Sequence, residues 1–324
     1  MLSIKKLQEE IQQFIKEHPY SKYPHELYDP LDYMMALGGK RIRPIMVLLG
    51  HGIYSEDTKH ALPAAICVEV FHNFSLIHDD IMDEAPLRRG QETVHQKWNH
   101  NTAILSGDVM LVKAYELLLH YDKNQLHSLL SLLNKTAIEV CEGQQIDMMF
   151  EKMLDVTLDD YLKMIELKTA VLLACSLKMG AIIANASEND ANNLYEYGRL
   201  MGIAFQLRDD YLDVYADPSK FGKQVGGDIL SNKKTYLLIE ALNNSNLSQK
   251  EVLKHWLSLK DFNPSEKIQA ITNIYNELDI PNHIQKKIES FAAEANKHLD
   301  EIKGNKEVID LLKSISSELL VREN

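Results

Sequence analysis

Apolar residues recur at helical spacing along nearly the whole chain. Close to the C-terminus they keep the three-and-four spacing that one buried helix face requires, at Val308, Leu311, Leu312, Ile315 and Leu319. No segment shows the alternation of a strand, and no proline occurs between Pro86 and Pro218, which favours helices there. The pattern predicts an all-α fold of roughly a dozen helices in a single domain over residues 1–324. Its core would extend from about Ala61 to Asp217.

Composition narrows the classes of protein to which the chain can belong. Of the 324 residues, 45% are hydrophobic and 25% are charged, as in ordinary globular domains. The formal net charge of −12 argues against a nucleic-acid partner. Three cysteines without metal-ligand spacing indicate buried thiols in a reducing compartment. The first 18 residues carry charges throughout, unlike a signal peptide, and no apolar run reaches the length of a membrane span. We therefore expect a cytoplasmic protein without stable membrane insertion.

Two acidic clusters share the pattern Asp-Asp-x-x-Asp, and each directly follows an apolar helical run. Their members are Asp79, Asp80 and Asp83 in one cluster and Asp209, Asp210 and Asp213 in the other. On a helix the first and last aspartates lie about 40° apart around the axis and one turn apart along it. Such charges repel unless something offsets them, and Mg²⁺ prefers oxygen ligands of this kind. A solvated helix end would explain one cluster, but the repetition favours two metal-binding sites.

Basic and polar residues occur where an anion bound to those metals would need them. The glycine turn Gly38-Gly39 leads into a basic run that contains Lys40 and Arg43. Further candidates follow the clusters or interrupt apolar helices: Arg88, Arg89, Lys168, Thr169, Lys223 and Lys233. Each could be an ordinary solvated side chain. Together they supply the phosphate ligands that the acidic clusters lack.

These motifs, in this order from Gly38 to Thr235, resemble those of the trans-prenyl diphosphate synthases. The family includes the farnesyl and geranylgeranyl diphosphate synthases. The motifs are Gly-Gly-Lys-x-x-Arg-Pro, His-Asp-Asp-x-x-Asp with Leu-Arg-Arg-Gly, Lys-Thr, and Phe-Gln-x-x-Asp-Asp-x-x-Asp with Gly-Lys-x-x-Gly-x-Asp. The resemblance implies a helical bundle around a deep central cavity, a homodimer and dependence on Mg²⁺.

The resemblance also implies a role for each matching residue. Magnesium would be bound by Asp79, Asp83 and Asp209, with Asp80, Asp210 and Asp213 as direct or water-mediated ligands. The allylic diphosphate would be held by Arg88, Lys168, Gln206 and Lys233, with Lys223 nearby. Isopentenyl diphosphate would be held by Lys40, Arg43, His72 and Arg89, and Thr169 and Gln206 would line the space in which charge develops.

The implied reaction is ionisation of an allylic diphosphate, attack by isopentenyl diphosphate on the cation, and loss of a proton. A terpene cyclase would not need Lys40, Arg43 and His72 for a second diphosphate. A non-catalytic regulatory subunit would normally have lost aspartates from one cluster, and here all six are present. The sequence therefore favours an active synthase.

Product length depends on the residues that precede the first cluster. Phe74 and Ser75 lie five and four positions before Asp79, so a chain growing away from the metals would pass them. One aromatic followed by one small residue predicts geranylgeranyl diphosphate, with farnesyl diphosphate or a longer product as alternatives. Phe74 could instead be a core residue alone. The C-terminal tail is less basic than in some relatives; it reads Leu320-Val321-Arg322-Glu323-Asn324. The sequence therefore does not predict whether this tail closes over a diphosphate.

Overall fold

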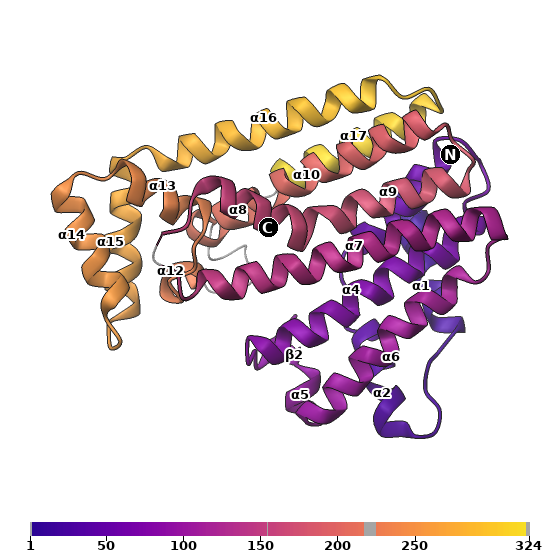
Figure 1. The fold of residues 1–324 in the computed structure, drawn as a ribbon, viewed down its shortest axis with the longest axis horizontal. Coiled ribbons are helices and arrows are strands. Elements are labelled where there is room, and N and C mark those ends of the chain that lie inside the picture. The colour runs from indigo at the N-terminus through magenta and orange to yellow at the C-terminus, as the bar shows by residue number, and fades with distance from the viewer. Residues whose placement is uncertain (1, 154, 217–224, 322–324) are drawn as a thin grey trace. The chain divides into compact units, whose positions relative to one another are not determined.

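The computed structural model describes residues 2–153, 155–216 and 225–321, and the described chain is almost entirely helical (Figure 1). In chain order its helices are α1 (Ile4–Glu17), α2 (His25–Ala36), α3 (Ile42–Gly52), η1 (Thr58–Ala61), α4 (Leu62–Met82), α5 (Val94–Lys97), α6 (His100–Leu118), α7 (Lys123–Phe150), α8 (Leu158–Ile165), η2 (Glu166–Ala170), α9 (Val171–Ile183), α10 (Glu188–Tyr215), α12 (Gly227–Leu230), α13 (Tyr236–Asn244), α14 (Leu247–Ser258), α15 (Pro264–Glu277), α16 (Ile280–Asp300) and α17 (Lys306–Val321). The all-α prediction is confirmed. Short helices such as α5 and α12 raise the number above the expected dozen.

One small sheet interrupts the helices and was not expected from the sequence. Strands β1 (Leu87–Arg88) and β2 (Gln91–Glu92) pair antiparallel directly after the first acidic cluster. Two residues a strand are too few to show alternation, so the periodicity could not reveal this hairpin. The turn between the strands has positive φ at Arg89 (54°) and Gly90 (75°).

The contacts of the chain group it into two compact units. The first unit comprises Met1–Thr136, Leu172–Tyr195 and Glu301–Leu312, and the second comprises Ala137–Val171, Glu196–Asp300 and Lys313–Asn324. A single domain over residues 1–324 therefore stays a prediction. The first acidic cluster lies in the first unit and the second cluster in the second.

Helix α4 is the central helix of the first unit. Most of its residues from Pro63 to Phe74 are buried, and it packs against α3 and α6. With η1 it forms one stretch, Thr58–Met82, that is long and apolar enough to cross a membrane, which the sequence analysis did not anticipate. Since 72% of its most apolar window is buried inside the protein, this composition reflects a core helix.

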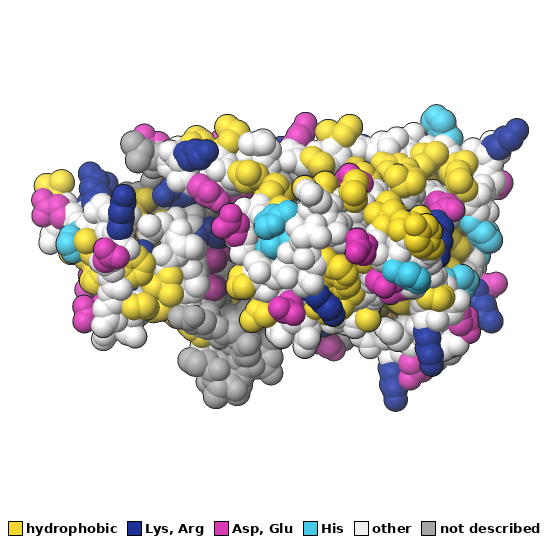
Figure 2. All heavy atoms as spheres, turned by 90° about the horizontal axis from the view of Figure 1, so that it is seen from below, with side chains coloured by type: hydrophobic (Ala, Val, Ile, Leu, Met, Phe, Trp, Pro, Cys, Tyr) yellow, Lys and Arg dark blue, Asp and Glu magenta, His cyan; other side chains and the backbone are white. Residues whose placement is uncertain are grey.

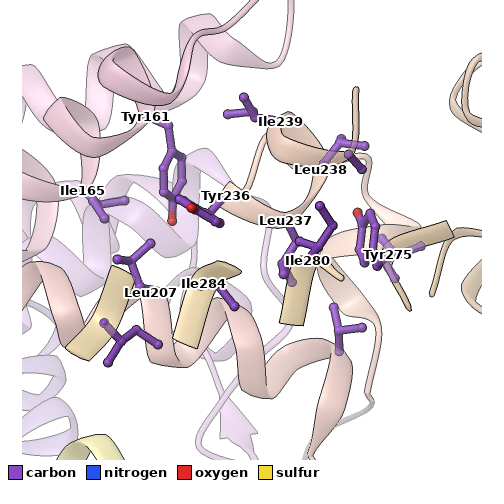
Figure 3. Close-up of a cluster of buried hydrophobic side chains, with 14 of the residues drawn as sticks. Tyr161, Ile165, Leu207, Tyr236, Leu237, Leu238, Ile239, Tyr275, Ile280 and Ile284 are labelled. Atoms are coloured by element: carbon purple, nitrogen blue, oxygen red, sulfur yellow. The ribbon is translucent and has the colours of Figure 1, made fainter. Parts of the chain in front are cut away.

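The second unit has its own hydrophobic core, shown in Figure 3. Tyr161 and Ile165 from α8 face Leu207 from α10, and side chains from α13, α15 and α16 complete the cluster. The apolar stripes of these helices make the cluster continuous, because each stripe must be buried against another. This core supports the α10 segment that bears the second acidic cluster.

The surface is mixed in character. On the face drawn in Figure 2, acidic and basic side chains are interspersed with several clusters of apolar ones.

Candidate active site

The first acidic cluster occupies the C-terminal end of α4, and its three aspartates differ in exposure. Asp80 is buried, with 1% of its surface exposed, whereas Asp79 is half-buried and Asp83 is exposed at the C-cap. The Arg88 Nε donates to both carboxylate oxygens of Asp80, at 2.9 and 2.8 Å, and its Nη2 donates to Oδ1 at 2.7 Å. The protein thus holds the middle aspartate, while the two outer ones lie nearer the surface.

Three of the residues predicted to bind isopentenyl diphosphate lie near the start of α3. Arg43 is on α3 itself, His72 is on α4, and Arg89 is in the turn between β1 and β2. Arg43 Nη1 lies 3.1 Å from His72 Nε2, and Arg89 Nη1 donates to the carbonyl of Gly38. Arginine only donates, so Nε2 of His72 accepts and Nδ1 carries the ring proton when the ring is neutral. Burial and the nearby guanidinium groups, Arg43 first, hold the pKa of His72 well below its usual value. The imidazole is therefore neutral within a group of cations, and the positive charge of this group comes from the arginines. Lys40 directly precedes this helix start.

A buried ion pair beneath this group was missed by the sequence analysis. Arg41, the N-cap of α3, donates to Glu69 of α4, and both side chains are only 4% exposed. A charged residue inside an apolar helical run was the available signal, but the position of its partner could not be read from spacing. Buried charges of this kind need partners.

The second acidic cluster lies near the end of α10 and repeats the arrangement of the first. Asp210 is buried, whereas Asp209 and Asp213 are half-buried. The Tyr161 hydroxyl donates to Asp210, and Gln206 Nε2 donates to it at 3.3 Å. Burial and the charge of Asp228 raise the pKa of Asp210 to about 7. In both clusters the middle carboxyl is held inside the protein and the outer two are more accessible.

Lys168 and Thr169 lie in a π-helical segment, η2, between α8 and α9. Single π turns are frequent at functional sites. Here the wider turn passes close to α7, since a Cβ built on Gly143 would lie 2.7 Å from the Lys168 Cα. Lys168 Nζ donates to Asp147 at 2.6 Å, and the Thr169 hydroxyl donates to Gln206 Oε1 at 3.2 Å. The segment therefore links Thr169 through Gln206 to Asp210, and Asp147 is a further acid that the sequence analysis missed.

Of the two lysines that follow the second cluster, the structure describes only Lys233. The charge of Lys233 acts on Asp210 and lowers its pKa, which opposes the effect of burial, so Lys233 lies near the second cluster. Lys223 lies outside the described residues. Asp213 Oδ2 accepts a hydrogen bond of 2.9 Å from the backbone N–H of Asp228.

The residues predicted to set product length lie on α4 at different depths. Phe74 is buried, and its ring contacts His78 edge-to-face at 4.8 Å between centroids and Phe71 at 5.6 Å. Ser75 is half-buried, and its hydroxyl donates to the His72 carbonyl at 2.9 Å.

The outer aspartates of each cluster, Asp79 with Asp83 and Asp209 with Asp213, are candidate ligands for a divalent metal ion. Among the described residues, no three His, Cys, Asp or Glu side chains form a group that could hold an ion alone. Mg²⁺ is usually bound by one or two carboxylates, with water and substrate phosphates as the other ligands. The paired outer aspartates of each cluster are a donor set of that kind.

Comparison with known proteins identifies the family. A sequence model described as polyprenyl synthetase matches residues 24–275, which include all the motifs given above. The chain belongs to the polyprenyl synthetase family. This confirms the resemblance found in the sequence, and the chain is an isoprenyltransferase.

Individual members of the polyprenyl synthetase family extend the comparison. The geranylgeranyl diphosphate synthase of Methanosarcina mazei is 44% identical over 220 residues, 67% of this chain and 68% of that one. A crystal structure of a geranylgeranyl pyrophosphate synthase superposes with a TM-score of 0.95 at 43% identity and covers all of both chains. The synthase of Corynebacterium glutamicum, solved with isoprenyl diphosphate and magnesium, gives a TM-score of 0.86 at 27% identity over 98% of both chains.

Proposed function

We propose that this polyprenyl synthetase condenses isopentenyl diphosphate head to tail with an allylic prenyl diphosphate and releases geranylgeranyl diphosphate. The observation that carries the proposal is the matched construction of the two aspartate clusters. Each holds its middle carboxyl in the protein interior and keeps its outer pair, Asp79 with Asp83 or Asp209 with Asp213, more accessible.

Mg²⁺ bound at both clusters would neutralise the leaving diphosphate of the allylic substrate and so promote ionisation of its C–O bond. Asp79, Asp83, Asp209 and Asp213 would be its ligands. Asp80 and Asp210 would bind the metal through water or add negative charge behind it, because Arg88 and Tyr161 already donate hydrogen bonds to their carboxylate oxygens. The magnesium in the structure of the Corynebacterium glutamicum enzyme supports this choice of ion.

Cationic side chains would bind the allylic diphosphate beside those aspartates. Lys168 is paired with Asp147 at 2.6 Å, so its ammonium group is already oriented before a phosphate arrives. Lys233 acts on Asp210, and Arg88 is fixed by Asp80. Lys223, outside the described residues, would add a further charge. Pre-oriented donors stabilise a developing anion without reorganising during the reaction.

Isopentenyl diphosphate would bind at the start of α3, where Lys40, Arg43, His72 and Arg89 meet the Gly38-Gly39 turn. Neutral His72 can donate from Nδ1 without adding to the charge of the arginines.

The allylic carbocation would be stabilised by the dipoles of nearby polar side chains. Thr169 and Gln206 are hydrogen-bonded to each other, so they present fixed dipoles. In this scheme the released diphosphate takes the proton that leaves.

The product would have twenty carbons because Phe74 is the single aromatic side chain of the pair that precedes the first cluster. Ser75 has a small side chain whose hydroxyl is bonded to the backbone of α4, so it would obstruct a growing chain less than an aromatic residue. Farnesyl diphosphate is the alternative if side chains on other helices shorten the tail. Two similar proteins support the twenty-carbon product. The relative from Methanosarcina mazei and the crystal structure at 43% identity are both named geranylgeranyl diphosphate (pyrophosphate) synthases.

We further propose that the protein is a cytoplasmic homodimer. Along α6 and its C-cap, three apolar side chains follow one another at seven-residue intervals: Leu105, Val112 and the C-cap Leu119 are 57%, 66% and 65% exposed. Such a stripe along one helix face is typical of a contact with another helix. A second copy of the chain, with its own α6, is the partner that fits this symmetric pattern.

The metal clusters are tested by Asp79→Ala and Asp209→Ala, with Asp310→Ala, an exposed aspartate on α17, as the control. We expect each cluster variant to lose activity by orders of magnitude with an unchanged circular dichroism spectrum, because a metal ligand and not a packing group is removed. The control should keep full activity. Near-normal turnover in both cluster variants would refute the proposal.

A further inference from the structure

The turn that leads into α3 contains a backbone conformation that needs support. Arg41, the N-cap, has φ 52° and ψ 39°, the left-handed region, and it follows Gly38 and Gly39, which also have positive φ. For a residue with a side chain this conformation is unfavourable, because its Cβ comes too close to the following carbonyl oxygen. The surrounding contacts must therefore hold Arg41 in place.

Those contacts come chiefly from Glu69 on α4. Arg41 donates from Nη1 to Glu69 Oε1 and from Nη2 to the carbonyl of Met35, at the end of α2. Glu69 in turn accepts from Asn73 Nδ2, at 3.3 Å. Arg41 is 6% exposed and Glu69 is 3% exposed, so the whole arrangement is buried within the first unit.

The same turn is attached to α4 a second time, one helical turn further along. Arg43 lies 3.1 Å from His72, and His72 follows Glu69 by three residues, so Glu69 and His72 share a face of α4. Arg41 and Arg43 therefore contact residues one helical turn apart on the same face of α4. Arg89 binds the Gly38 carbonyl of the same turn. The Arg41–Glu69 pair thus fixes the position of the start of α3 relative to α4, and with it the positions of Lys40, Arg43 and Arg89.

Glu69 also balances charge. Its negative charge acts on Arg89 and opposes the charges of Arg41 and Arg88 there. Glu69 is thus paired with the buried Arg41 and also offsets part of the repulsion that Arg89 feels from its neighbouring arginines. Buried ion pairs contribute little net stability compared with apolar residues of equal volume, and fixing a register is their best-attested use.

We propose that Glu69 is a positioning residue for isopentenyl diphosphate. It acts through Arg41, whose left-handed conformation it fixes, and so places Lys40 and Arg43 around the diphosphate. This inference rests on the proposed function and adds a residue outside every motif named above.

The decisive variant is the double substitution Arg41→Met with Glu69→Met, which replaces the buried pair by apolar side chains of similar length. We expect a melting temperature close to that of the wild type and a KM for isopentenyl diphosphate raised about tenfold, whereas the KM for the allylic substrate changes less than twofold. The control pair is Lys313→Ala with Asp300→Ala, which removes an ion pair of 2.7 Å at the surface of the second unit. It should leave both constants unchanged.

Glu69→Gln is the second variant, because it keeps the acceptor oxygen and the shape of the side chain. We expect a smaller rise in the same constant alone. The proposal is overturned if a folded Met–Met or Glu69→Gln protein binds isopentenyl diphosphate as the wild type does, or if the constants for both substrates rise together. Failure of the proposed function has a different result, since wild-type protein would then give no condensation product at all.

Discussion

The buried carboxyl of Asp210 makes the stability of the metal-free protein depend on pH. Its pKa in the folded protein is raised from 3.8 to about 7, mainly by burial and then by the charge of Asp228. An acid with a raised folded pKa keeps its proton in the folded state after the unfolded chain has released it. The stability that this proton confers is present below pH 3.8 and is lost as the pH rises to about 7.

The size of the effect follows from the two pKa values. A difference of about three pH units corresponds to about 4 kcal/mol in the free energy of unfolding above pH 7. Between pH 5 and pH 8 the loss amounts to about 2.5 kcal/mol. Asp210→Asn has no titrating proton and nearly the same shape, so it lacks this dependence. Its amide can still receive the Tyr161 hydroxyl bond at the carbonyl oxygen.

The assay is urea unfolding of the wild type and Asp210→Asn in EDTA, at pH 5 and at pH 8. From pH 5 to pH 8, we expect the free energy of unfolding of the wild type to fall by about 2.5 kcal/mol relative to that of the variant. Asp310→Asn, on an exposed helical aspartate, controls for loss of charge. Adding Mg²⁺ at pH 8 should narrow the gap, because a bound cation favours the ionised carboxylate. An equal difference between variant and wild type at both pH values would refute the reasoning.

Three further predictions concern the substrates, the product and the assembly. Arg43→Ala should raise mainly the KM for isopentenyl diphosphate, and Lys168→Ala mainly that for the allylic substrate; equal effects on both substrates in steady-state kinetics would contradict the division. Phe74→Ala should lengthen the product and Ser75→Phe should shorten it, as measured by chromatography of the hydrolysed products, and unchanged products in both would mean that the tail runs elsewhere. Val112→Glu on the α6 stripe should convert a dimer to monomers in sedimentation velocity, whereas a wild-type protein that is an active monomer would rule the dimer out.

Patterns that are local in the chain could be predicted from the sequence. The apolar periodicity gave the helical fold because a stripe at three-and-four spacing has to be buried. Both Asp-Asp-x-x-Asp motifs lie near the ends of long helices, α4 and α10, where the preceding apolar runs predicted helix. Such features depend only on the geometry of one helix, which spacing fixes.

Features that depend on a distant partner could not be predicted. Glu69 is 28 residues from Arg41, and Tyr161 is 49 residues from Asp210, so no spacing rule relates either pair. The π turn at Lys168 lies against Gly143 on α7, 25 residues earlier in the chain, and spacing does not reveal that contact either. The difference between inner and outer aspartates likewise depends on these partners.

The central claim is that the protein makes geranylgeranyl diphosphate in a magnesium-dependent condensation. The most direct test incubates the purified 324-residue chain with labelled isopentenyl diphosphate, farnesyl diphosphate and Mg²⁺, and measures the chain length of the labelled product. The account predicts a product of twenty carbons, and none in EDTA. Absence of any labelled prenyl diphosphate with Mg²⁺ present, or a cyclic hydrocarbon released from the allylic substrate alone, would contradict it.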